Sequence, residues 1–207
     1  MKDLVVKEIF MHSPAIMAIL FLCGLALVTY VLERLWFYHS IGKIKEDWWR
    51  QLKGLVAQNK IKEAISYCVE DGRLFAKIIK SGLENIAISR VHVEETLSIG
   101  KERMLLSLRK RLGLFGTLSF VSPLLGLLGT VLGIMQAFND LALSGSGGPT
   151  IVARGISQAL VATAAGIIIA VPSAVAYNYF TYRLRDIMSK ADTHIQELIL
   201  AIYGRPQ

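Results

Sequence analysis

The chain has 207 residues, of which 53% are hydrophobic and 19% charged, and its mean hydropathy is +0.47. This composition is too apolar for an ordinary soluble domain and indicates a membrane protein, because the apolar residues come in blocks. The net charge of +7 is then attributed to membrane topology and attraction to anionic lipids. No nucleic-acid partner is expected, because the sequence contains no recognised nucleic-acid-binding module.

Three blocks of the sequence contain no Asp, Glu, Lys, Arg or His: Ser13–Leu32, Gly113–Phe138 and Gly155–Phe180. Each reaches the length of about 20 mostly apolar residues that a spanning helix needs. Lipid offers the backbone no hydrogen-bond partners, and the blocks lack the alternation of barrel strands. We therefore predict an all-α membrane protein with transmembrane helices at residues 13–32, 113–141 and 155–180.

The first predicted span follows a short N-terminus, residues 1–12, and is expected to be an uncleaved anchor. The weakly charged start, the lack of a small-x-small cleavage site and the charged pair Glu33-Arg34 all disfavour a signal peptide. Cys23 is interpreted as a packed apolar residue, since the bulky Leu22 before it disfavours a lipoprotein site.

Basic residues set the predicted orientation of the spans. Residues 33–112 contain 16 of the 23 lysines and arginines, whereas residues 142–154 contain only Arg154. Because basic segments are retained on the cytoplasmic side, we predict that residues 33–112 and the tail at 181–207 are cytoplasmic. The N-terminus and the hairpin loop at 142–154 are then outside.

The predicted cytoplasmic part is expected to be helical. Apolar residues at three- and four-residue spacing predict three short, packed helices, at residues 45–58, 61–72 and 73–86. From Val93 the helical pattern meets no proline until Pro123, and we predict one helix to about Ala142, roughly 75 Å long. The third span should likewise continue to Tyr203 with its apolar stripe packed. Spanning helices two and three would thus extend far into the cytoplasm beside a small helical domain.

No enzyme, metal or cofactor signature is found. The four histidines lack metal-ligand spacing and are expected at the surface or at interfaces: His12, His39, His92 and His194. Cys23 and Cys68 lie in different predicted segments and form no disulfide framework. The glycine-rich stretch at 144–149 lacks the lysine of a P-loop and the strand that a nucleophile elbow needs. We therefore expect a protein that is not an enzyme and holds no cofactor.

Small residues form stripes along the second and third spans. One stripe consists of Gly126, Gly129 and Gly133, and the other of Gly155, Ala159, Thr163, Gly166 and Ala170. Such stripes let helices approach closely in lipid. Most of them are attributed to packing within the chain, but two long helices carry more of this surface than one hairpin uses. Oligomerisation is the expected consequence.

Thr130 and Thr163 are the polar residues nearest the middle of these spans. Each hydroxyl either bonds the carbonyl one turn back, without a function, or lines a path for ions. A hydroxyl does not titrate at ordinary pH, so any proton relay must borrow a carboxylate from another subunit. Pro123 and Pro172 should loosen their helices at the carbonyls four residues earlier, either as hinges or as fixed kinks.

The segments SPLLGLLGTVLGIMQAF (122–138) and GISQALVATAAGIIIAVPSAVAYNYF (155–180) together resemble the paired signature of the MotA/TolQ/ExbB proton-channel family. The plan of one anchor, a cytoplasmic domain and a hairpin is similar to the three-span ExbB and TolQ branch, and differs from the four-span MotA branch.

The resemblance implies a bacterial inner-membrane protein with a periplasmic N-terminus and a cytoplasmic C-terminus. It implies a homo-pentamer around two copies of a single-span ExbD- or TolR-like partner, whose membrane aspartate carries the proton, and a TonB- or TolA-like transducer. Thr130 and Thr163 match the family's lumen-facing threonines, so they are expected in the ion pathway. The implied function is that of a channel or stator subunit that uses the proton-motive force for TonB-dependent uptake or Tol-Pal function.

Gln158, expected in the same pathway, departs from the family pattern. Many ExbB and TolQ proteins carry a glutamate five residues before the second threonine, and glutamine cannot titrate. A homologous motor for motility or secretion therefore stays open, as does a non-conducting scaffold that uses the same glycine stripes. A substrate transporter is disfavoured, because we find neither internal repeats nor a midplane binding site.

Overall fold

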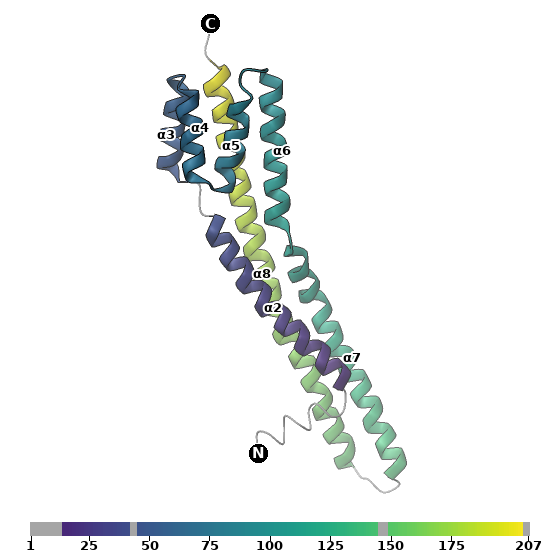
Figure 1. Ribbon diagram of the computed structural model, residues 1–207. Helices are drawn as coiled ribbons and strands as arrows, with labels where there is room; N and C mark the ends of the chain where they lie inside the picture. The colour runs from purple at the N-terminus through teal and green to yellow at the C-terminus, as the bar shows by residue number, and fades with distance from the viewer. Residues whose placement is uncertain (1–13, 42–44, 145–148, 205–207) are drawn as a thin grey trace. The chain divides into compact units, whose positions relative to one another are not determined.

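The computed structural model describes residues 14–41, 45–144 and 149–204 (Figure 1). Helices account for 92% of these residues, and no strand occurs among them. Three helices are long and apolar enough to cross a membrane. They are α2 (Pro14–Ile41), α7 (Leu112–Ser144) and α8 (Pro149–Tyr203). The predicted all-α fold with three spanning helices is confirmed, and the chain is a multi-pass membrane protein.

Two predicted segments fall partly or wholly outside the described residues. These are the N-terminus at residues 1–12, with His12, and the centre of the hairpin loop at 142–154. The described ends of that loop are helical, because α7 runs to Ser144 and α8 begins at Pro149. Proline suits the first turn of a helix, where its missing N–H would have no partner anyway.

The described residues divide into two compact units, and α2 and α8 contribute residues to both. The span unit comprises the described residues of Met1–Glu33 and Arg111–Tyr179. The bundle unit comprises those of Arg34–Lys110 and Phe180–Gln207.

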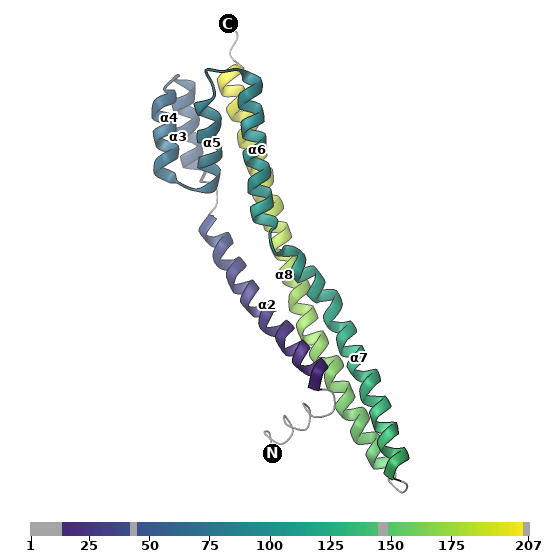
Figure 2. The ribbon, with the colours of Figure 1, turned by 45° about the vertical axis from the view of Figure 1, so that its right-hand side comes forward.

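The bundle unit contains four further helices: α3 (Glu46–Ala57), α4 (Ile61–Asp71), α5 (Leu74–Glu84) and α6 (Arg90–Arg109). In Figure 2, α3, α4 and α5 gather side by side, and α6 runs along the yellow end of α8. The ion pair between Lys101 Nζ and Asp192 Oδ1, 2.7 Å long, joins α6 to α8. The three short helices predicted at residues 45–58, 61–72 and 73–86 agree with α3, α4 and α5 to within two residues.

The core of the bundle unit draws on every one of its helices. The fully enclosed side chains include Leu52, Ile79, Leu97 and Leu198, from α3, α5, α6 and α8. The apolar stripe predicted on the tail also packs there: Leu184, Ile187, Met188, Ala191, Ile195, Leu198 and Ile199. Burial raises the pKa of the Cys68 thiol to about 12, so this cysteine stays protonated and packs as an apolar side chain.

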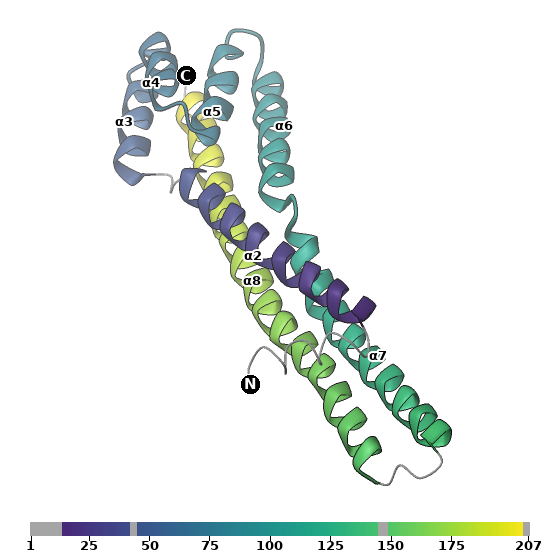
Figure 3. The ribbon, with the colours of Figure 1, turned by 60° about the horizontal axis from the view of Figure 1, so that its bottom comes forward.

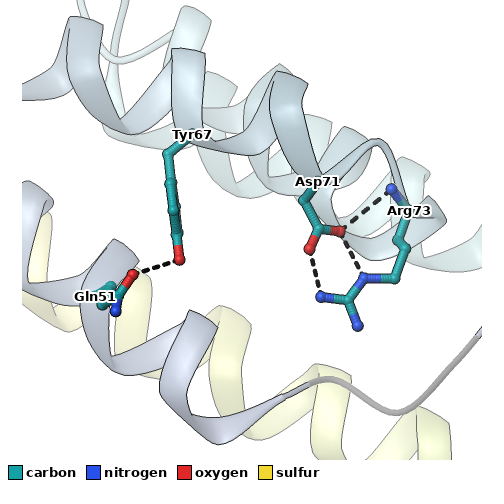
Figure 4. Close-up of polar contacts among 4 residues, drawn as sticks. All are labelled: Gln51, Tyr67, Asp71 and Arg73. Atoms are coloured by element: carbon teal, nitrogen blue, oxygen red, sulfur yellow. Dashed lines mark hydrogen bonds and ion pairs between the residues drawn. The ribbon is translucent and has the colours of Figure 1, made fainter.

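A glycine and an ion pair shape the turn between α4 and α5 (Figure 4). Gly72 ends α4 with a φ of 62°, in the left-handed region that glycine adopts without steric cost. Asp71 accepts hydrogen bonds from the Arg73 backbone N–H and from its guanidinium, with Nε 2.7 Å from Oδ1. The Arg73 guanidinium lowers the pKa of Asp71. Figure 4 also shows Tyr67 donating to Gln51, which joins α4 to α3.

The prediction of one uninterrupted helix from Val93 to Ala142 is wrong at one point. Helix α6 ends at Arg109, and α7 begins at Leu112. Arg111 has a φ of 66°, which an α-helix cannot contain. Its guanidinium forms an ion pair with Glu33, 2.8 Å between Nη1 and Oε1, and lies 5.5 Å from the Tyr30 ring centroid. These contacts with α2 accompany the non-helical conformation of residue 111.

The expectation that the histidines lie at the surface or at interfaces is wrong for His194. His39 and His92 are exposed, but His194 is only 6% exposed and lies in the bundle core. The position belongs to the apolar stripe of α8, where a histidine ring packs as an aromatic side chain against Trp49.

In the span unit, α7 and the first part of α8 run side by side in all three orientations (Figures 1, 2 and 3). Helix α2 packs on this pair. A Cβ placed on Gly129 of α7 would lie 3.3 Å from Ile16 Cγ2 of α2, and one placed on Gly24 of α2 would lie 3.8 Å from Ile169 of α8. The candidate site therefore lies in a close three-helix packing.

Candidate functional site

Glycines bring the backbones of α7 and α8 together. A Cβ added to Gly133 would lie 2.7 Å from the Ala159 Cβ, and one added to Gly129 would lie 2.7 Å from the Ala162 Cβ. A Cβ on Gly166 would lie 2.5 Å from the backbone oxygen of Ser122. These separations are too short for real side chains. The two stripes therefore pack on each other within one chain, as small residues do in lipid.

The same close approach joins the two threonine hydroxyls, Thr130 on α7 and Thr163 on α8, in a short hydrogen bond. Thr130 Oγ1 is also 3.2 Å from the Gly126 carbonyl oxygen on its own helix and 3.4 Å from that of Ala159 on α8. Thr163 Oγ1 is 3.2 Å from the Gly126 carbonyl oxygen on α7. We call Thr130, Thr163 and these two carbonyls the hydroxyl pair site.

Only one of the two hydroxyls in the hydroxyl pair site bonds a carbonyl of its own helix. Thr130 reaches the carbonyl one turn back, as threonines in helices commonly do. Thr163 instead reaches across to α7. Gly126 makes this possible, because a Cβ there would lie 2.8 Å from the Ala162 carbonyl oxygen and 3.0 Å from the Thr163 Cα. Its missing side chain lets the Gly126 carbonyl face both hydroxyls.

The pair has a defined hydrogen-bonding capacity. Two hydroxyls supply two hydrogens: the bond between the hydroxyls uses one, and the Gly126 or Ala159 carbonyl can accept the other. The hydroxyl oxygens retain lone pairs, so the site can either accept a proton donor's hydrogen bond or redirect its own hydrogens to an anion. The blocks that form the spans contain no acidic or basic side chain, so the site itself carries no charge.

Two further polar groups of the span unit are buried and have no hydrogen-bond partner among the described residues. They are the Gln158 Oε1 on α8 and the Ser122 Oγ on α7. A buried polar group without a partner costs about 1–3 kcal/mol, so each position calls for an explanation. Gln158 was expected in the ion pathway. Ser122 was missed, although it lies on the face of Gly126 and Thr130, four and eight residues ahead in the sequence.

Both prolines lie inside continuous helices. Pro123 is within α7, and Pro172 is within α8. Each is adjacent to a fully buried serine, Ser122 or Ser173. Ser173 Oγ donates to the Ile169 carbonyl at 2.7 Å, which satisfies one backbone acceptor near the proline. A hinge at either proline is still a prediction.

The described residues outside the span unit contain no candidate metal centre. No group of three or more His, Cys, Asp or Glu side chains among them could hold a metal ion. Charged contacts gather in the bundle unit, where Glu197 Oε2 accepts from Trp49 Nε1 at 2.7 Å and from Lys53 Nζ at 3.2 Å. Hydrogen bonds from Trp49 and Lys53 lower the pKa of Glu197.

These features define a class: an all-helical, multi-pass membrane protein that holds an uncharged pair of hydroxyls between two closely packed spanning helices. Residues 70–193 match the MotA/TolQ/ExbB proton channel family, and the chain belongs to that family.

Individual relatives agree with this assignment. The chain is 28% identical over 191 residues to biopolymer transport protein ExbB of Pseudomonas putida, across 86% of the chain and 57% of that relative. It is 30% identical over 173 residues to Tol-Pal system protein TolQ of Haemophilus influenzae, across 83% of the chain and 72% of the relative. Over 130 residues it is 35% identical to ExbB of Aquifex aeolicus, across 61% of the chain and 86% of the relative. The chain thus spans little more than half the length of the Pseudomonas relative.

Proposed function

We propose that this chain is the channel or stator subunit of an ExbB/TolQ-like complex driven by the proton-motive force. Membership of a proton channel family supports a role of this kind. The observation that carries the finer proposal is the hydroxyl pair site, which joins Thr130 to Thr163 in apolar blocks that contain no Asp, Glu, Lys, Arg or His. Such a wall can guide a proton only together with a carboxylate supplied by another protein.

We further propose the topology and location of the subunit. It would lie in the bacterial inner membrane with residues 1–12 and 142–154 periplasmic, and with residues 33–112 and 181–207 cytoplasmic. The excess of basic residues in the latter two segments supports this orientation. The bundle unit would then face the cytoplasm, where the same basic residues attract anionic lipids.

The proposed partners follow from the missing carboxylate. Proteins of this family are expected to act within a complex, and we assign this chain to a homo-pentamer around an ExbD- or TolR-like single-span protein. That partner would supply the membrane aspartate, and a TonB- or TolA-like transducer would receive the mechanical work. Within this assembly the chain acts as a channel wall and not as an enzyme.

The hydroxyl pair site suggests how the wall would respond to the partner. In the isolated chain the Gly126 and Ala159 carbonyls compete for the hydroxyl hydrogens. An ionised carboxylate is a stronger acceptor than a neutral carbonyl, by roughly a factor of two in hydrogen-bond strength. Thr130 and Thr163 would therefore turn toward the partner's carboxylate when it is ionised and return to the carbonyls when it is protonated. The site thus distinguishes the two protonation states without titrating.

The proposal is tested by replacing both hydroxyls with isosteric methyl groups, in Thr130→Val with Thr163→Val. Proton flux into liposomes that contain the purified complex should fall by roughly tenfold or more, the effect of losing charge-assisted hydrogen bonds along the path. The matched control is Thr117→Val on the same helix, because Thr117 is exposed and its hydroxyl bonds only its own helix, at the Gly113 carbonyl.

Assembly must be measured on the same samples. The double variant should still purify with its single-span partner, since the glycine contacts between α7 and α8 do not involve the hydroxyls. Unchanged flux in an assembled double variant would reject the ion-pathway role and favour the non-conducting scaffold.

Gln158 supports a second candidate within the same family, a homologous motor for motility or secretion. Its amide oxygen is buried without a partner among the described residues, at a position where the resemblance to the family implies a glutamate in many ExbB and TolQ proteins. Purification of the native complex would decide between the candidates, because the third component would differ.

A further inference from the structure

His194 occupies an unusual environment for a titratable side chain. It lies on the part of α8 that belongs to the bundle unit and is 6% exposed. Both ring nitrogens are buried, and neither has a hydrogen-bond partner among the described residues. The imidazole therefore behaves as an aromatic packing group, which is a role suited to its neutral form.

The contacts of this ring hold α3 against α8. The Trp49 ring of α3 lies 4.5 Å from the His194 ring, centroid to centroid, with 33° between their planes. The same Trp49 donates from Nε1 to Glu197, which lies one turn further along α8. The Phe75 ring of α5 also lies near the His194 ring, with 6.1 Å between the two centroids. Trp49 is thus fastened to α8 twice, once through its ring and once through its N–H.

Charged groups on two helices surround the imidazole. From α3 it faces Glu46 and Lys53, and from its own helix it faces Lys190 and Glu197. Phe75 is the contact from α5, and it carries no charge. Glu197 Oε2 already accepts from Trp49 and Lys53, so a protonated His194 could gain that oxygen only in competition with them.

We propose that His194 is a proton-responsive contact: the neutral ring fastens α3 to α8, and protonation releases α3 from α8 as the pH falls. The imidazolium carries two N–H donors that the core does not accept, so it moves toward Glu46 and Glu197 and displaces Trp49 from both of its contacts. The attraction between the imidazolium and the Trp49 ring opposes this movement but leaves both donors unsatisfied.

The direction of the pH response follows from the burial of the ring. Burial lowers the pKa of His194 below the ordinary value of 6.5, against the opposing effect of Glu46 and Glu197. Below about 6.5 the unfolded or released ring binds more protons than the packed ring, so the packed state loses stability as the pH falls toward the lowered pKa. Above 6.5 both forms are neutral and the contact is fully stable.

The packing change itself does not depend on the proposed function, but its regulatory meaning rests on it. Proton inflow through the complex would acidify the compartment that the bundle unit faces. Release of α3 would then signal the proton inflow to any protein that is bound to the bundle unit.

Hydrogen–deuterium exchange on the full-length complex in detergent tests the inference. After correction for the intrinsic pH dependence of exchange, protection of α3 (residues 46–57) should fall between pH 7.5 and 5.5 by up to about tenfold, because a released ring with a pKa of 6.5 gains this much from protonation at pH 5.5 while the packed ring stays neutral. In His194→Phe the protection should be constant over that range. The matched control is His92→Phe, which replaces an exposed histidine of the same unit and should retain the wild-type response.

Several results would overturn the inference. Wild-type protection of α3 that does not change with pH would do so without any variant. A pH response that persists in His194→Phe, or in His194→Gln where the phenylalanine variant does not fold, would place the titrating group elsewhere. Proton flux measured on the same preparation separates the two proposals: pH-dependent α3 without flux contradicts only the proposed function, and flux with pH-independent α3 contradicts only this inference.

Discussion

At the residue scale, Gly126 sets the chemistry of the hydroxyl pair site by what it lacks. The absence of a Cβ allows the α7 backbone to meet α8, and the Gly126 carbonyl then accepts from Thr163 across the helix pair. The sequence predicted the spacing of the small residues and singled out both threonines. It could not predict the crossed hydrogen bond, because the register between two helices is not contained in the periodicity of either.

Gly133 offers a direct test of the close helix contact. In Gly133→Ala the new Cβ would lie 2.7 Å from the Ala159 Cβ and 3.2 Å from the Ala159 Cα, so the backbones of α7 and α8 must move apart. We expect a loss of about 1–3 kcal/mol, the usual cost of overpacking, seen as a lower thermal midpoint in detergent. Gly113→Ala is the control on the same helix, because a Cβ there meets no atom within 4 Å. Equal midpoints for the two variants would contradict the packing.

At the scale of elements, the sequence predicted where the helices lie but not where one of them breaks. Apolar spacing located α3, α4 and α5 closely, because an amphipathic pattern over ten or more residues is a strong signal. The interruption between α6 and α7 carries no such signal, since the segment "LRKRLG" contains no proline and its glycine follows the break. Arg111 has a left-handed conformation, and its side chain contacts Glu33 and Tyr30, which are distant in sequence.

The break at residue 111 predicts which of two substitutions gives the more stable protein. Both Arg111→Gly and Arg111→Ala remove the ion pair with Glu33, so their difference isolates the backbone. At a φ of 66° alanine bears a strain of roughly 1–2 kcal/mol that glycine avoids, and the glycine variant should be the more stable in thermal unfolding. In an uninterrupted helix the order would reverse, because glycine there costs about 1 kcal/mol relative to alanine. A more stable alanine variant would therefore contradict the break at residue 111 and support one continuous helix.

At the scale of the whole molecule, the two units carry different kinds of polar chemistry. The span unit holds neutral groups between its helices, with Thr130 and Thr163 paired and the Gln158 amide oxygen buried without a partner among the described residues. The bundle unit holds ion pairs and a buried histidine. Composition alone predicted this separation, because the apolar blocks contain no charged residue. The burial of His194 was missed, although residue 194 lies three residues after Ala191 and four before Leu198 and so has the spacing of the apolar stripe.

Gln158→Glu tests how many titrating groups the assembled channel uses. If the wild-type path relies on the partner's carboxylate alone, the dependence of proton flux on pH should follow one ionisation, and a glutamate at residue 158 should add a second one to the profile. Gln158→Met, which is similar in size and uncharged, should keep the wild-type shape, because it removes an amide whose oxygen has no partner among the described residues. Flux would be recorded in liposomes that contain the purified complex, across the same pH series for all three proteins. Superimposable profiles for the wild type and Gln158→Glu would mean that residue 158 does not face the path, and the borrowed carboxylate would then have to meet Thr130 and Thr163 from another side.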